Sequence, residues 1–198
     1  MKGRAVWVPV LALAMALGAQ AQETGKVGEP VAKEFKLKDA MKDDDATINL
    51  ADFKGKNEVV LVWISEKCDI TWRYEARTGK LQEEFGKKGV KFFAVWGSSA
   101  DSKEGIRGYC KSKNYGMPVL DDANGELTRY FKVAVTPTYV VIDKEGKLRY
   151  TGACDDLQCS PASYQKADSD AKERYVAAAL TSILDGKEVA ITTKRGAG

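Results

Sequence analysis

Histidine does not occur among the 198 residues of this sequence. Its absence excludes every catalytic arrangement that needs an imidazole base and every metal site with histidine ligands. Cysteine is also scarce, with four residues at positions 68, 110, 154 and 159. Because these thiols are scattered and lack the close paired spacing of zinc ligands, we expect no metal and no other cofactor. The chemistry that remains open to the chain is largely that of thiols.

A strong excess of charge of one sign is missing as well. The sequence holds 31 Lys and Arg residues against 28 Asp and Glu residues, which gives a formal net charge of +3. Nucleic acids and anionic membrane surfaces attract proteins through a marked basic excess, which this chain does not have. We therefore expect no nucleic-acid partner.

The sequence also has no apolar run of the length that spans a bilayer, about 20 residues. Its first apolar stretch, residues 5–18, follows two basic residues and is interrupted by Pro9. Ala19-Gln20-Ala21 then fits the small-x-small pattern at which export signals are cleaved. We predict a signal peptide over residues 1–21 and a periplasmic or secreted protein, without stable membrane insertion after cleavage.

The chain that remains after residue 21 is long enough for one compact domain to bury most of its apolar surface. Residues 22–33 are rich in Gly, Glu and Lys and show little periodicity, which predicts a flexible lead-in. A single domain is expected over residues 34–186, followed by a flexible tail over residues 187–198.

Apolar runs and amphipathic stretches alternate along this domain. The continuous run Val59–Ile64 is typical of a central strand covered on both faces. The other predicted elements are a helix at 70–88, a strand at 90–96, a helix at 103–113, a strand at 117–120, a helix at 126–131, a strand at 133–143, a return strand at 148–151 and a helix at 168–185. This order predicts an α/β sandwich around one mixed sheet.

Five features of the sequence occur together. They are an apolar strand that runs into Cys68, a helix that starts at that cysteine, the strand Gly89–Val95, the segment Met117–Asp122, and Val135–Thr138 followed by Val140–Gly146. With them the sequence resembles the thioredoxin-fold superfamily, and within it the exported redoxin group of alkyl hydroperoxide reductases and thiol-specific antioxidant proteins. The resemblance implies a thioredoxin-like α/β sandwich with a central mixed sheet, an N-terminal extension and a C-terminal helix.

The resemblance also assigns expectations to residues around Cys68. In the superfamily a cis proline packs beside the active cysteine, which implies a cis Pro137 in this chain. The usual dithiol motif has a second cysteine three residues after the first, where this chain has Thr71, so no disulfide can form within the motif. Two roles are open for the Thr71 hydroxyl: a bond to a backbone N–H at the helix start, or a hydrogen bond to the Cys68 thiolate.

The peroxidase relatives carry a further pattern that this chain meets in part. Ser65 stands three residues before Cys68, where those relatives have Thr or Ser, but Leu61 occupies the position of their proline. Arg149 lies where they have an arginine on a late strand. By resemblance Arg149 would stabilise a bound peroxide or thiolate, whereas as an ordinary strand residue it would be solvated.

Cys68 is the best-placed reactive thiol because backbone N–H groups at the start of a helix favour the nucleophilic thiolate. Its oxidised products need a second thiol to resolve them. Cys110 is one candidate, since some peroxidase relatives draw their resolving cysteine from that region, but it also fits a small buried core residue. Cys154 and Cys159, on the loop after the last strand, are the other two candidates, but their spacing favours a structural disulfide in an oxidising compartment over a resolving role.

Three functions follow from these observations. The first is an exported thiol-disulfide oxidoreductase with Cys68 as its single motif cysteine, which acts on protein or small-molecule disulfides with a thiol reductant as partner. The second is a peroxiredoxin-like peroxidase that reduces hydroperoxides. The third is a non-catalytic binding module that has kept the fold without the dithiol.

Overall fold

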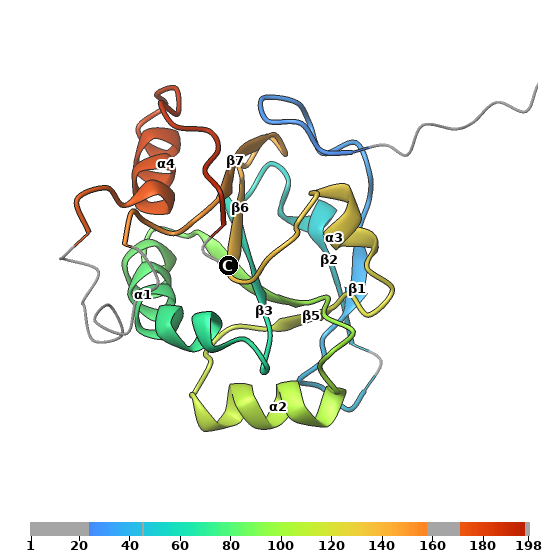
Figure 1. Cartoon of the computed structure of the whole chain (residues 1–198). Helices are drawn as coiled ribbons and strands as arrows, with labels where there is room; N and C mark the ends of the chain where they lie inside the picture. The colour runs from blue at the N-terminus through green and yellow to red at the C-terminus, as the bar shows by residue number, and fades with distance from the viewer. Residues whose placement is uncertain (1–23, 45, 158–170, 197–198) are drawn as a thin grey trace, which may run out of the picture.

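The computed structural model describes residues 24–44, 46–157 and 171–196, and in this part of the chain five strands form one mixed sheet in the order β5-β4-β3-β6-β7 (Figure 1). These strands are β3 (Val59–Ile64), β4 (Lys91–Trp96), β5 (Val119–Asp121), β6 (Thr138–Ile142) and β7 (Leu148–Gly152). The central strand β3 runs parallel to β4 and antiparallel to β6. The predicted α/β fold with a central mixed sheet is confirmed.

The remaining elements cover the sheet or extend it. The helices are α1 (Asp69–Gly86), α2 (Lys103–Ser112), α3 (Glu126–Tyr130), α4 (Tyr175–Leu184) and the 3-10 turn η1 (Leu50–Phe53), and the short strands β1 (Lys36–Lys38) and β2 (Thr47–Asn49) pair antiparallel. Side chains of α1, α2 and α4 fill the core on one face of the sheet. Side chains of α3, β1 and η1 fill it on the other face. No described helix is both long enough and apolar enough to cross a membrane.

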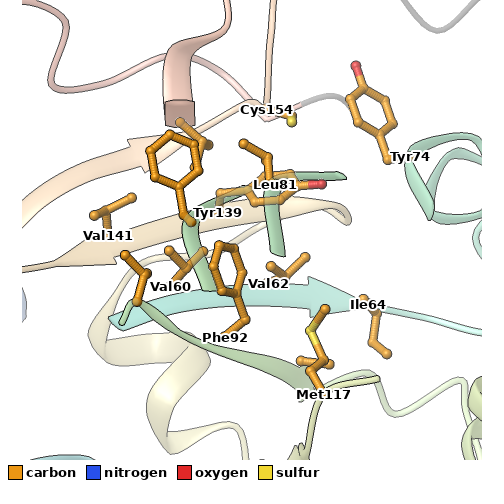
Figure 2. Packing of buried hydrophobic residues seen from close by; sticks show 14 of the residues in the cluster. Val60, Val62, Ile64, Tyr74, Leu81, Phe92, Met117, Tyr139, Val141 and Cys154 are labelled. Atoms are coloured by element: carbon orange, nitrogen blue, oxygen red, sulfur yellow. The ribbon is translucent and has the colours of Figure 1, made fainter. Parts of the chain in front are cut away.

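The strand β3 has the bounds and the burial that its continuous apolar run predicts. All six of its side chains are buried. Because successive side chains of a strand point to opposite faces, Val60 and Val62 enter the core beneath α1, whereas Leu61 and Trp63 enter the other one. Figure 2 shows Val60 and Val62 beside Phe92 of the neighbouring strand β4. The central strand therefore holds both layers of the domain together.

The described residues of the predicted lead-in and tail are tied to the domain rather than free of it. Gly25 and Gly28 donate their backbone N–H groups to the carbonyl oxygens of Tyr130 and Leu148, at 2.9 and 2.7 Å. At the other end, Thr193 forms a parallel bridge with Thr151 of β7. These hydrogen bonds and this bridge are made by backbone groups, and a few apolar side chains of both segments also pack against the two cores.

Two elements are shorter than their patterns predict. Residues 133–137, expected as the first half of a strand, form a loop, and β6 begins only at Thr138. The terminal helix begins at Tyr175, after residues 171–174 in irregular structure; residues 168–170 of the predicted helix lie outside the described part. The shortened β6 matters most for function, because its preceding loop reaches the end of β3.

Candidate thiol site

Cys68 is placed by the turn that links β3 to α1. Its backbone N–H donates to the carbonyl oxygen of Ser65 at 3.3 Å, and its own carbonyl accepts from the N–H of Trp72 at 3.4 Å. Cys68 has extended backbone angles and is the residue that precedes the first turn of α1. Its side chain is half-buried. Cys68 therefore lies at the strand-to-helix junction, as the sequence predicts.

The loop 133–137 lies against this thiol. The pairing of Trp63 with Thr138 brings the start of β6 beside the end of β3. The Thr136–Pro137 peptide bond is cis, which confirms the expectation for Pro137. The Cys68 thiol donates to the carbonyl oxygen of Thr136, with 3.2 Å between Sγ and O. This carbonyl can accept only from the protonated thiol, because a thiolate has no proton to donate.

A cavity of about 460 Å³ opens beside Cys68. Its other lining residues come from the end of β3, the loop after β4, α3 and the loop before Pro137: Trp63, Ser65, Gly97, Ser98, Ser99, Thr128, Val133, Ala134, Val135 and Thr136. None of the described residues that line it carries a charge. The cavity therefore suits an uncharged group, and it has far more room than a hydrogen peroxide molecule occupies.

A hydrogen-bonded chain forms one wall of this cavity. The indole Nε1–H of Trp63 donates to the hydroxyl of Thr128 at 2.8 Å, and that hydroxyl donates to the fully buried carboxylate of Asp122 at 2.6 Å. A Cβ on Gly97 would overlap the Thr128 oxygen, so the chain needs a glycine there. Asp122 belongs to a segment that supports the resemblance, but nothing in the sequence singles out Thr128 as its partner.

Ser65 builds the turn and has no hydrogen bond to the thiol. Its hydroxyl donates to Oδ1 of Asp101 at 2.9 Å and accepts from the backbone N–H of Lys67 at 3.2 Å. Asp101 comes from the loop before α2, and no sequence motif points to its contact with Ser65. Burial raises the pKa of this carboxyl, and the hydrogen bond from Ser65 opposes the rise. Asp101 thus links the loop after β4 to the turn that presents Cys68.

Thr71 takes neither of the two roles open to it. Its side chain is buried, and its hydroxyl has no hydrogen-bond partner in the described part of the chain. It therefore neither caps α1 nor bonds to Cys68.

Arg149 lies at the wrong end of the sheet for the role that the resemblance implies. Its guanidinium pairs with Asp143 at 2.9 Å and with Glu188 at 3.2 Å. Ile142 pairs with Val59, so Asp143 follows β6 at the end where β3 begins, whereas Cys68 follows the opposite end of β3. The expectation that Arg149 stabilises a peroxide or thiolate at Cys68 is corrected by this register.

The other described cysteines are core residues. Cys110 of α2 is 2% exposed, and burial, with a smaller contribution from the Glu75 carboxylate, raises the pKa of its thiol to about 12. A thiol with this pKa is a poor resolving nucleophile at neutral pH. Cys154 is buried in the same core. Cys159 lies outside the described residues, so the expected Cys154–Cys159 disulfide stays a prediction. The described residues contain no cluster of three or more His, Cys, Asp or Glu side chains that could hold a metal ion.

Comparison with known protein families gives one match that covers most of the domain. The redoxin family model matches residues 26–167. This chain belongs to the redoxin family.

Similar redoxins with curated names are thiol-disulfide oxidoreductases called ResA. The protein of Bacillus thuringiensis subsp. konkukian is 29% identical over 103 residues, which cover 51% of this chain and 57% of that protein. The protein of Oceanobacillus iheyensis is 29% identical over 125 residues, 62% of each chain. The match thus spans less than two thirds of the length of either relative.

A solved structure extends the likeness of fold to most of this redoxin. A hypothetical protein from Sinorhizobium meliloti 1021 superposes with a TM-score of 0.72 and 24% identity, over 88% of this chain and 94% of that one. At this level of identity the likeness shows the fold alone.

Proposed function

We propose that this redoxin is an exported thiol-disulfide oxidoreductase with Cys68 as its nucleophile. The observation that carries the proposal is the place of Cys68, half-buried at the start of α1 and open to an uncharged cavity. The ResA relatives, which are named for this activity, support it. Export is supported by the sequence pattern of residues 1–21.

The proposed reaction is thiol-disulfide exchange in two steps. The Cys68 thiol loses its proton to solvent, and the thiolate attacks one sulfur of a substrate disulfide. The S–S bond of the substrate breaks, a mixed disulfide with Cys68 forms, and the other substrate sulfur leaves as a thiolate. A reductant thiolate then attacks the substrate sulfur of the mixed disulfide, so that Cys68 leaves as a thiolate and the reductant and the substrate half are joined in a new disulfide.

The second step needs a thiol from outside the motif. Thr71 stands where a dithiol enzyme has its second cysteine, and its hydroxyl cannot replace a sulfur in exchange. Cys110 is buried with a raised thiol pKa, which argues against it as the internal resolving group. We therefore expect an external thiol to complete each turnover.

The peroxidase alternative loses much of its support. It rests on Ser65 and Arg149, but the Ser65 hydroxyl bonds to Asp101 and Arg149 pairs at the opposite end of β3. A non-catalytic binding module has no observation in its favour beyond the absent second cysteine. The exchange reaction remains the function that the geometry supports best.

The proposal is tested by mapping the cysteines of the mature protein by mass spectrometry after exposure to a small aromatic disulfide. We expect a mixed disulfide on Cys68, loss of turnover with a thiol reductant in a Cys68→Ser variant, and little change in Cys110→Ser. Equal turnover in the wild-type protein and Cys68→Ser would overturn the proposal.

The same map, made after one equivalent of hydrogen peroxide, tests the alternative. Because Cys110 is buried and its thiol pKa is high, we expect no Cys68–Cys110 disulfide. Formation of that disulfide would favour the peroxidase.

A further inference from the structure

The segment after α4 returns to the sheet and runs along β7. We name residues 187–196 the C-terminal strap; in Figure 1 it is the red segment that leads from α4 back toward β7. The N–H of Thr151 donates to the carbonyl of Thr192 at 3.1 Å, and the N–H of Lys194 donates to the carbonyl of Thr151 at 3.2 Å. The side chain of Val189 is buried. The strap is thus anchored by backbone hydrogen bonds and by apolar contact.

Gly152 of β7 shows how closely the strap approaches the sheet. Its φ of +143° is one that residues with a side chain rarely adopt. A Cβ at this position would overlap the carbonyl group of Lys194. A side chain at position 152 would therefore clash with the strap in its observed place.

The far end of the strap reaches the loop that carries the cis proline. A Cβ on Gly196 would lie 2.6 Å from Cγ2 of Val135 and 2.7 Å from Oγ1 of Thr138. These two residues flank Thr136 and Pro137. Val135 lines the cavity beside Cys68, and the Thr136 carbonyl accepts the hydrogen bond of the Cys68 thiol. The strap therefore packs against both sides of the group that holds the thiol.

We propose that the C-terminal strap is a positioning element of the thiol site, which holds the Thr136 carbonyl in hydrogen-bonding distance of the Cys68 thiol. A hydrogen bond to the protonated form of a group disfavours its charged form. Displacement of the strap from the loop loosens this contact, and Cys68 then reacts faster with disulfides at neutral pH. The inference rests on the proposed function, since it concerns the same thiol.

Two glycine substitutions, one in β7 and one at the end of the strap, are expected to displace the strap. Gly196→Val places a side chain against Val135 and Thr138, and Gly152→Ala places one against Lys194. Gly79→Ala, in α1, is the matched control because a Cβ there meets no atom within 4 Å. Far-UV circular dichroism establishes that each variant is folded, and because Gly196 lies at the end of the strap, its variant still tests the inference if Gly152→Ala does not fold.

The measurement is the rate of reaction of Cys68 with a small uncharged disulfide as a function of pH, in proteins that also carry Cys110→Ser. We expect the pH profiles of Gly196→Val and Gly152→Ala to shift to lower pH, with a rate at pH 7 about fivefold above wild type, because a larger fraction of Cys68 is then thiolate. The Gly79→Ala profile should match that of the wild-type protein.

The outcomes separate the two proposals. If Cys68 of the wild-type protein reacts and the pH profile of Gly196→Val is the same as that of wild type, the role of the strap is overturned. The oxidoreductase proposal then stays intact. A slower reaction in both strap variants also overturns the role of the strap, because the strap would then promote the reactive form. A wild-type Cys68 that reacts at no pH overturns the proposed function itself.

Discussion

At the scale of single residues, the site around Cys68 is built from the turn after β3, the loop after β4 and the loop before β6. A buried apolar strand followed by a helical pattern is enough to place Cys68 at the junction. The same pattern does not predict the contact between Cys68 and the Thr136 carbonyl, because every residue has a carbonyl. Asp101 is equally hidden, since its contact with Ser65 depends on a loop that only the folded sheet brings close. Local periodicity predicts where a helix or strand ends, but it does not predict which residues of other segments contact that end.

Asp101 gives a pH dependence that can be measured. Burial raises its pKa above the usual 3.8, so the folded protein binds this proton more tightly than the unfolded chain. The stabilisation that belongs to the protonated form is present at low pH and is lost as the pH rises through the raised pKa. We expect Asp101→Asn to remove this loss, so that its free energy of unfolding improves relative to wild type as the pH increases from about 4 to about 7.

The measurement is urea unfolding at several pH values across that range, with the exposed Asp52→Asn as the control. The asparagine amide oxygen can still accept from Ser65, so the turn is kept. A difference between Asp101→Asn and wild type that stays constant with pH would contradict the assignment.

At the scale of elements, the prediction succeeds where one element is buried along its whole length. β3 has the bounds of its apolar run, and α1 ends within two residues of its expected bound. β6 is the counter-example: residues 133–137 have the apolar character of a strand but fold as a loop across the end of β3. Val133 packs against one core and Val135 lines the cavity. Their apolar side chains are therefore accommodated in a loop, without strand pairing.

Helix α1 is joined to the segment after β7 by a buried ion pair. Arg77 is 2% exposed and lies 3.3 Å from the fully buried carboxylate of Asp155. Its guanidinium also lies 4.5 Å from the centre of the Tyr74 ring. Removal of one partner of a buried pair leaves a costly charge, so we expect Asp155→Asn to lower the free energy of unfolding by about 3 kcal/mol. Thermal and urea unfolding at neutral pH measure this change.

The control for this prediction is the exposed pair Lys87–Glu83 on the same helix. Glu83→Gln should leave the free energy of unfolding nearly unchanged, because water screens that pair. If Asp155→Asn is as stable as Glu83→Gln, the pair does not hold the segment to α1.

At the scale of the whole molecule, the resemblance predicts the family and the fold, because the order of strands and helices is itself a pattern. It does not predict that the described parts of the lead-in and the tail are bound to β7 and its hairpin. Glycine-rich and charged stretches have no hydrophobic periodicity, and the hydrogen bonds that fix them here are made by backbone groups. The apolar contact of Val189 is isolated in the sequence, so it forms no periodic pattern that would predict the place of the strap.

Export is the prediction that concerns the chain as a whole. If residues 1–21 form a cleaved signal, the protein recovered from the periplasm of a bacterial host begins at Gln22. Intact-mass measurement and N-terminal sequencing check this. A charged residue in place of Ala21 should block cleavage and leave the longer precursor. Mature protein that still begins at Met1 would contradict the signal.

The place of β6 in the sheet has a consequence for how the chain folds. β3 pairs with a strand about 80 residues later in the sequence, and this long-range pairing completes the centre of the sheet. Proteins dominated by such pairs have high contact order and fold slowly, because a large loop closes before the contact forms. The native sheet therefore cannot assemble while only the first half of the chain is available.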